Sequence, residues 1–371
     1  MPNQKKDVCP ICKKENIPDV NFCVSCRYPI NVKKINELSK EDLLVHISML
    51  FDTIKQKEPL FADKETEEIY DELFNLNWLR PESALFSFLQ MQILLDLKVK
   101  YLKYPILDVG CGDGVFTSIL FGARLNKNYD SYESIDFCKS DIYNNHIKRP
   151  EDFLISKSKP FGSGMDIKAN SVNLARELKT YDQVKTGDAR KMPFNDKSFS
   201  SVFSNMIDDI KREDLDVVFN EVNRVLKKDG FFVFITPTNK FREFMLYYNK
   251  AQEFKEQGDL DKYKHYLELD RGRSEWEPRD MSLWSDLFDK TSFEFVKSIE
   301  FVNKDQLHFW DTGLRPFLKH MMDLRNTLRH NEMLFYVKRI WVDVIKSYLF
   351  KLIKNEKDKC GAFTIIVAKK I

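Results

Sequence analysis

Long apolar runs are missing from this chain of 371 residues, and its net charge is only +2. No stretch approaches the roughly 18 consecutive apolar residues of a membrane span, and the opening residues, MPNQKKDVCP, lack the apolar region of a signal peptide. We therefore expect a cytoplasmic protein without a transmembrane segment. The charge excludes a strongly basic protein; nucleic-acid binding is compatible with it but is not indicated by it. With 43% hydrophobic residues the chain can bury a large core, and we expect one large domain with an appendage.

Cysteine is scarce, and its placement argues against the disulfide framework of a small secreted domain. Three of the seven cysteines stand singly: Cys111, Cys138 and Cys360. The other four form two C-x-x-C pairs separated by ten residues, namely Cys9, Cys12, Cys23 and Cys26. Two such pairs direct four thiolates to one point, which suits the tetrahedral, sulfur-rich coordination of Zn²⁺. The pattern resembles small zinc ribbons and predicts one structural zinc ion; a disulfide pair or an iron–sulfur cluster is the alternative.

Glycine is also scarce, with 12 residues, yet three of these stand at alternate positions in ILDVGCGDG, residues 106–114. The apolar run before Asp108 indicates a buried parallel strand, and residues 115–122 indicate the helix that follows a tight turn. A Cβ on these glycines would obstruct a positive φ or the close approach of a ligand. The free N–H groups at the start of the helix would face a carboxylate or a phosphate. The loop therefore predicts a site for a nucleotide-type cofactor.

The spacing of the glycines separates two classes of cofactor loop. The dinucleotide fingerprint is G-x-G-x-x-G, whereas this loop reads G-x-G-x-G with an acidic residue shortly before it. The stretch resembles the first motif of the class I S-adenosylmethionine (SAM) dependent methyltransferases. The resemblance implies a Rossmann-like fold and SAM contacts at Asp108, Gly110, Cys111, Gly112 and Gly114. A dinucleotide-binding loop, or a glycine-rich turn without a ligand, is the alternative.

Two positions compete for the acidic residue at the tip of the next strand. Asp166 in FGSGMDIK is followed 22 residues later by Asp188 in QVKTGDA, which leaves room for one helix, 169–178, and one strand. Asp136 in SYESIDF would leave more than fifty residues. We therefore choose Asp166, keep Asp136 as the alternative and treat 125–160 as an insertion.

In the methyltransferase family a carboxylate at this tip accepts hydrogen bonds from both ribose hydroxyls, as one does in dinucleotide-binding folds. The resemblance carries this role onto Asp166, with Ile167 beside it. It also implies that Asp188 and the backbone of Ala189 meet the adenine amine. An ordinary strand-end carboxylate is the alternative for either aspartate taken singly.

The stretch 192–210 resembles the family's passage from the third strand into the fourth, with Asn205 at its tip as a further cofactor contact. Many relatives carry a Glu-His pair after that tip, whereas this chain has Asp208 and Asp209. An exposed aspartate with a pKa near 4 is a weak base unless burial raises its pKa. Asp208, Asp209 and His308 are candidate acid or base groups; surface carboxylates and a packed histidine are the simpler interpretation.

The order of the predicted elements gives an α/β fold. Helices are expected at 66–80, 82–101 and 215–226, and strands at 231–237, 292–302 and 361–370. This order implies a Rossmann-like, seven-stranded, mostly parallel sheet whose last strand is antiparallel. The predicted domains are a zinc ribbon at 1–35, a helical lead-in at 36–103 and a methyltransferase domain at 104–371, with helical caps at 240–290 and 303–359. Trp310, Asp311 and Arg315, in the second cap, are candidates for the acceptor pocket.

The segment 335–354 carries an apolar stripe at helical spacing, flanked by basic residues. The stripe consists of Val337, Ile340, Trp341, Val344, Ile345, Tyr348, Leu349 and Leu352, and the flanking residues are Lys338, Arg339, Lys346, Lys351 and Lys354. Helices of this composition also lie on anionic membranes. We expect the stripe to pack inside the fold instead, because both faces of the sheet must be covered. Peripheral membrane contact is therefore not predicted.

The function that these resemblances imply is SAM-dependent methyl transfer to an acceptor that the sequence does not identify. A small molecule, a lipid-linked glycan, RNA or a protein is open. The zinc ribbon is similar to one that precedes this fold in an RNA guanine methyltransferase family, so an RNA base methyltransferase guided by the ribbon is one alternative. A binding or scaffold protein without catalysis, and a nicotinamide oxidoreductase, are the others.

Overall fold

The computed structural model describes residues 7–8, 14–16, 60–127, 129–132, 154–156, 160–205, 207–270, 272–314, 318–329, 333–354 and 360–371. The chain divides into two compact units. One consists of Met1–Pro59 with Arg325–Val344, and the other of Leu60–Leu324 with Ile345–Ile371. The second unit contains the central sheet and the glycine loop.

The central sheet has seven strands in the order β10-β11-β9-β8-β3-β6-β7. Their bounds are β3 Ile106–Val109, β6 Gly162–Asp166, β7 Gln183–Thr186, β8 Phe199–Ser204, β9 Leu226–Pro237, β10 Phe293–Phe301 and β11 Phe363–Lys370. β9, β8, β3, β6 and β7 run parallel to one another, whereas β11 runs antiparallel to both β9 and β10. The predicted Rossmann-like sheet with an antiparallel last strand is confirmed.

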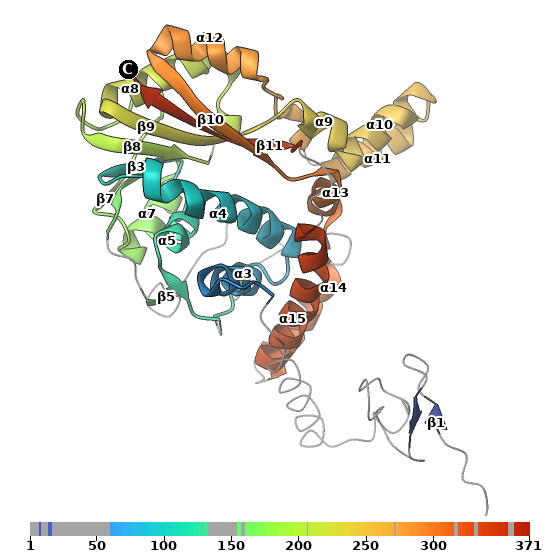
Figure 1. The fold of residues 1–371 in the computed structure, drawn as a ribbon. Coiled ribbons are helices and arrows are strands. Elements are labelled where there is room, and N and C mark those ends of the chain that lie inside the picture. Colours follow the sequence, from blue (N-terminus) through green and yellow to red (C-terminus); the bar gives the residue numbers. More distant parts are fainter. Residues whose placement is uncertain are drawn as a thin grey trace, which may run out of the picture. The chain divides into compact units, whose positions relative to one another are not determined.

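Helices cover both faces of this sheet (Figure 1). On one face lie α8, Leu215–Val225, and α12, Met281–Thr291. On the other lie α4, Pro81–Tyr101, α5, Val115–Leu120, and α7, Ala169–Leu178. The apolar positions of α8 recur every three to four residues, so one stripe of the helix reaches the core.

The core on the α8 face is mainly aromatic. The ring of Phe219 on α8 stacks on Trp284 of α12 with centroids 5.8 Å apart, and it meets Phe232 and Phe234 of β9 edge-on. All four side chains are fully buried. Burial of aromatic side chains on this scale contributes much of the stability of a domain, and here it fixes the strands whose ends carry the candidate site.

The lead-in helices and the insertion lie beside the sheet without joining it. α3, Lys64–Leu76, packs against α4 through the rings of Tyr70 and Phe88, whose centroids are 4.6 Å apart. β4, Arg124–Leu125, and β5, Leu154–Ser156, pair antiparallel in a separate two-stranded sheet. Among the described residues, β4 and β5 therefore form a sheet separate from the central one.

The predicted caps are helical in the described residues. They contain α9 Lys240–Phe244, α10 Leu246–Glu256, α11 Leu260–Asp270, α13 Lys304–Thr312, α14 Leu318–Leu328 and α15 Met333–Ile353. Short turns of 3₁₀ helix stand at η1 Ile207–Asp209, η2 Arg212–Asp214 and η3 Arg273–Glu275. In the parts of the chain that the structure describes, no helix has the length and apolar content to cross a membrane.

The buried face of α15 differs from the predicted stripe. Tyr348, assigned to the stripe, is 65% exposed, and Val344 is 53% exposed. Lys346, predicted to flank the stripe, is buried, and its Nζ lies 2.6 Å from Oδ1 of Asp71 on α3. A buried lysine is tolerated where a carboxylate compensates its charge, and this partner lies 275 residues away in the sequence.

The zinc-ribbon segment is described only at β1, Asp7–Val8, and β2, Glu15–Asn16, which pair antiparallel. Cys9, Cys12, Cys23 and Cys26 lie outside the described residues, as does most of the lead-in segment before residue 60.

Candidate active site

The glycine loop leaves the end of β3 and turns into α5. The amides of Gly110 and Cys111 donate to the carbonyl of Met165 on β6, at 2.8 and 2.9 Å. The φ angles of Gly110, Gly112 and Gly114 are all positive, at 76°, 55° and 77°, so each of the three occupies a conformation that glycine adopts most readily.

Two of these glycines differ in what surrounds them. A Cβ on Gly114 would lie 2.8 Å from the ring of Tyr181, so the loop packs tightly there. A Cβ on Gly112 would meet no protein atom within 4 Å. The backbone at Gly112 therefore borders open space, where a ligand could approach it.

Asp108 braces the loop from inside the fold. Its Oδ2 accepts hydrogen bonds from the hydroxyls of Thr117 and Tyr181, each at 2.6 Å, and the side chain is buried. Burial raises the pKa of Asp108 to about 6. Cys111 is also buried, and burial raises the pKa of its thiol. Neither side chain lines the cleft beside the loop.

A cleft of about 500 Å³ opens at the carboxyl ends of β3, β6 and β7. It brings together six of the sequence-predicted residues, namely Gly110, Asp166, Ile167, Asp188, Ala189 and Asp209. Val109, Met165 and Ile210 add apolar lining. Open α/β sheets bind their ligands at this edge, where the strand order reverses beside the first strand.

Asp166 is the last residue of β6 and connects the cleft to the glycine loop. Its Oδ2 accepts from the amide of Gly112 at 3.0 Å, and its Oδ1 accepts from the amide of Lys168 at 2.8 Å. β6 pairs in parallel with β3, so the tips of the two strands are adjacent. Sequence spacing selected Asp166 over Asp136; the latter lies outside the described residues.

Asp188 lines the same cleft as Asp166 and is bound by Arg190, a residue that the sequence analysis did not predict as part of the site. Arg190 donates to the carboxylate through Nε at 3.1 Å and through a terminal nitrogen at 2.6 Å, and its other terminal nitrogen reaches Asp214 at 3.2 Å. The hydrogen bonds from Arg190 lower the pKa of Asp188. The carboxylate is therefore an ionised acceptor beside Ala189, already partly engaged.

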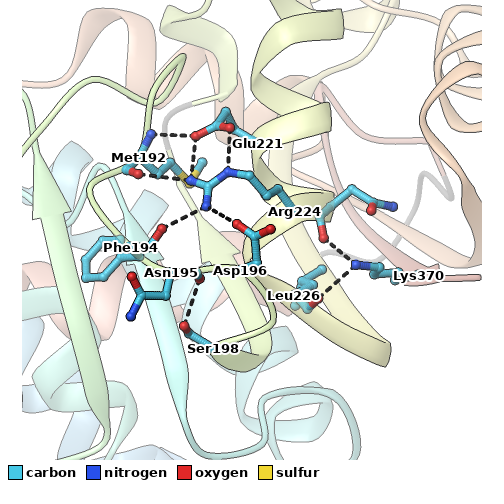
Figure 2. Close-up of polar contacts among 10 residues, drawn as sticks. Met192, Phe194, Asn195, Asp196, Ser198, Glu221, Arg224, Leu226 and Lys370 are labelled. Carbon is cyan, nitrogen blue, oxygen red and sulfur yellow. Dashed lines mark hydrogen bonds and ion pairs between the residues drawn. The ribbon is translucent and has the colours of Figure 1, made fainter.

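The loop that follows Asp188 is fixed from α8 (Figure 2). Arg224 donates to the carbonyls of Met192 and Phe194, at 3.0 and 2.8 Å, while Glu221 accepts from the amide of Met192 at 2.7 Å. The two side chains also pair with each other at 2.7 Å. This arrangement holds the residues after Asp188 in a defined position.

Asn205 follows the tip of β8 and contacts the lead-in region. Its side-chain nitrogen donates to Gln90 on α4 at 3.1 Å, and Gln90 is 2% exposed. The neighbouring Ser204 hydroxyl donates to the carbonyl of Val109 at 2.9 Å. The tip of β8 is thus tied to both β3 and α4. The side chain of Asn205 is directed to α4, and the residue does not line the cleft.

The acidic turn after β8 has unusual electrostatics. Burial and, to a smaller extent, the adjacent Asp209 charge raise the pKa of Asp208 to about 7, while the charge of Arg279 opposes the shift. Burial also raises the pKa of Asp209, which lines the cleft. Asp208 does not line it. An aspartate can act as a base at neutral pH if burial raises its pKa, and burial raises the pKa of Asp208 in this way.

The cap candidates form a separate group. Asp311 is fully buried; it accepts from the amides of Leu246 and Tyr247, each at 2.9 Å, and pairs with Arg273 at 2.9 Å. The guanidinium of Arg273 lies 4.0 Å from the ring centroid of Trp310. Asp311 thus caps α10 and does not border the cleft. His308, on α13, does not line the cleft either, and Arg315 lies outside the described residues.

One stretch of the chain is similar to a known protein family. Residues 162–234 match the family model of the methyltransferase domain. The matched residues run from the start of β6 into β9 and include Asp166, Asp188 and Asp208.

A curated protein similar to this chain is a probable polyketide synthase 42 from Dictyostelium discoideum, 26% identical over 242 residues. The similarity covers 64% of this chain but only 8% of that relative's length. Among solved structures, a SAM-dependent methyltransferase from Thermotoga maritima is 14% identical with a TM-score of 0.39, covering 81% of this chain and 95% of that one. A geranyl diphosphate C-methyltransferase from Streptomyces coelicolor is 13% identical with a TM-score of 0.37, covering 78% and 84%.

Proposed function

We propose that this protein is a methyltransferase. It would bind SAM in the cleft at the ends of β3, β6 and β7 and transfer the methyl group to an acceptor. The observation that carries this proposal is the contact between Asp166 and the amide of Gly112 at 3.0 Å, beside backbone where an added Cβ would meet nothing. A cleft of about 500 Å³ is within the usual size of small-molecule sites. The residues present therefore suit a nucleoside-sized ligand.

Each cleft residue has a proposed part in holding the cofactor. Asp166 accepts hydrogen bonds from the ribose hydroxyls, with Ile167 against the purine. Asp188 and the backbone of Ala189 meet the adenine amine. The loop at Gly110 and Gly112 receives the amino-acid end, and Asp108 and Cys111 support the loop from behind.

SAM would supply an electrophilic methyl group on a sulfonium, open to in-line displacement. The protein's main task is then to hold the acceptor atom in line with that methyl and to exclude water, so no fixed catalytic residue is required. Where the acceptor must lose a proton, Asp208, Asp209 and His308 are the candidate bases. Of these three, Asp209 lines the cleft, and burial raises its pKa toward the range useful for a base.

Binding experiments separate this proposal from its rivals. We expect the chain to bind S-adenosylhomocysteine (SAH) and not NADH in isothermal titration. Binding of NADH in place of SAH would instead support a nicotinamide oxidoreductase. Binding of SAH without methyl transfer to any acceptor would support a scaffold protein.

The acceptor class can be read from a transfer experiment. Cell extract is incubated with the protein and methyl-labelled SAM, then separated into RNA, protein, lipid and small molecules. Label in RNA would support a base methyltransferase guided by the N-terminal segment. Label in another fraction would assign the acceptor to that class.

We further propose that Cys9, Cys12, Cys23 and Cys26 bind one structural Zn²⁺ in a ribbon at 1–35. The proposal rests on the spacing of the two C-x-x-C pairs; β1 and β2, which pair antiparallel, precede Cys9 and follow Cys12 in the sequence. The proposed domain order is then ribbon, helical lead-in at 36–103 and methyltransferase domain at 104–371, in a cytoplasmic protein.

A further inference from the structure

Arg279 is a buried cation in the segment before α12. The residue is only 4% exposed. Burying a guanidinium is costly unless its donors are satisfied. Burial accordingly lowers the pKa of Arg279, and the nearby Asp208 carboxylate opposes that shift. The contacts of the guanidinium must therefore compensate for the cost of burying it.

The guanidinium holds a turn that lies about 70 residues earlier in the chain. One terminal nitrogen donates to the carbonyl of Ile207 at 2.6 Å, and the other donates to the carbonyl of Ile210. These two carbonyls bracket η1, which follows the tip of β8. Within the turn, the amide of Ile210 also donates to the carbonyl of Ile207, at 3.2 Å. The planar fork of an arginine can bind both carbonyls at once, whereas a lysine offers one point.

The opposite side of this turn is part of the cleft. Asp209, Ile210 and Lys211 line it. The charges of Lys168 and Arg279 lower the pKa of Asp209, whereas the charge of Asp166, which also lines the cleft, raises it. Arg279 therefore contacts the backbone of the cleft wall from within the fold, without reaching the cleft itself.

We propose that Arg279 is a positioning residue, which fixes the turn whose residues Asp209, Ile210 and Lys211 line the cleft and so sets the affinity for the cofactor. The inference rests on the proposed SAM site. Without the fork, both carbonyls lose the guanidinium as a donor, the carbonyl of Ile207 keeps only the amide of Ile210, and the turn loses these bonds to the segment before α12. The wall can then move relative to Asp166, which is fixed separately through the glycine loop.

The chain offers a matched structural control next to Arg279. Asp280 caps the N-terminus of α12, accepting from the amide of Leu283 at 3.0 Å and from the hydroxyl of Ser282 at 2.6 Å. Removing such a cap typically costs about 1 kcal/mol of stability. Asp280→Ala thus weakens the same helix without removing a contact to the turn.

The test is isothermal titration of the full chain with SAH, alongside thermal unfolding of each variant. We expect Arg279→Gln to weaken SAH binding about tenfold, Arg279→Lys to restore part of the loss, and Asp280→Ala to lower the unfolding temperature with unchanged affinity. Should Arg279→Gln fail to fold, Arg279→Lys decides alone, with a loss of about two- to threefold expected against none for Asp280→Ala.

Two results would overturn the inference. One is an unchanged SAH affinity in the Arg279 variants. The other is an equal loss in Asp280→Ala, which would make the effect one of general stability. Both presuppose that the unaltered protein binds SAH; absence of that binding would contradict the proposed function itself.

Discussion

Replacement of Asp166 by alanine tests the assignment of the cofactor site at its most connected residue. The carboxylate accepts from two backbone amides, Gly112 at 3.0 Å and Lys168 at 2.8 Å, and is proposed to receive the ribose hydroxyls as well. Loss of this side chain leaves those hydroxyls without an acceptor and releases the glycine loop from β6. Both effects weaken cofactor binding.

The expected size follows from the kind of hydrogen bond that is lost. Leaving a partner of a charged acceptor unpaired costs about 1 to 3 kcal/mol, which corresponds to an increase of about 5- to 150-fold in the Kd for SAH. Asp166→Asn should be nearly as damaging. Asparagine keeps the shape of the aspartate side chain but has only one oxygen that can accept. The backbone N–H groups of Gly112 and Lys168 donate to different oxygens of the carboxylate, so one of them would lose its acceptor.

Isothermal titration with SAH measures this effect, with Asp136→Ala as the control. We expect the control to bind SAH like the unaltered protein. Loss of affinity in Asp136→Ala, together with normal affinity in Asp166→Ala, would refute the strand assignment and the cofactor contacts built on it.

Three further predictions concern other parts of the chain. Metal analysis should find one Zn²⁺ per chain, and Cys23→Ser should lower the zinc content while SAH binding persists; equal zinc in both proteins would disprove the ribbon. Because burial raises the pKa of Asp208 to about 7, its contribution to stability falls as the pH rises from about 4 to 7. The unfolding temperature of Asp208→Asn relative to the unaltered protein should therefore increase between pH 5 and pH 8, and a constant difference would contradict the raised pKa. Finally, the chain should not sediment with anionic liposomes; salt-sensitive sedimentation abolished by Lys351→Glu with Lys354→Glu, both exposed on or just after α15, would overturn the packed-helix interpretation.

Periodicity and residue spacing in the sequence were sufficient to predict the main helices and strands of the domain. Helix 169–178 coincides with α7, and the distance from Asp166 to Asp188 placed one helix and one strand correctly. These features are local, so the sequence carries them directly.

The features that the sequence did not reveal depend on partners distant in the chain. Arg190 reaches Asp214 across 24 residues, and Arg279 reaches Ile207 across 72. The burial of Lys346 depends on a carboxylate on α3. No short-range pattern encodes such pairs, because the fold brings them together.

The most direct test of the central claim is methyl transfer that depends on the open space at Gly112. Gly112→Val fills that space with side-chain atoms, and Gly258→Val is its matched control, since both glycines have positive φ and neither would bring a Cβ within 4 Å of another atom. Incubation of cell extract with methyl-labelled SAM should give a labelled acceptor with the unaltered protein and with Gly258→Val, and only background with Gly112→Val. Labelling by Gly112→Val at the rate of the unaltered protein would contradict a cofactor bound at this loop.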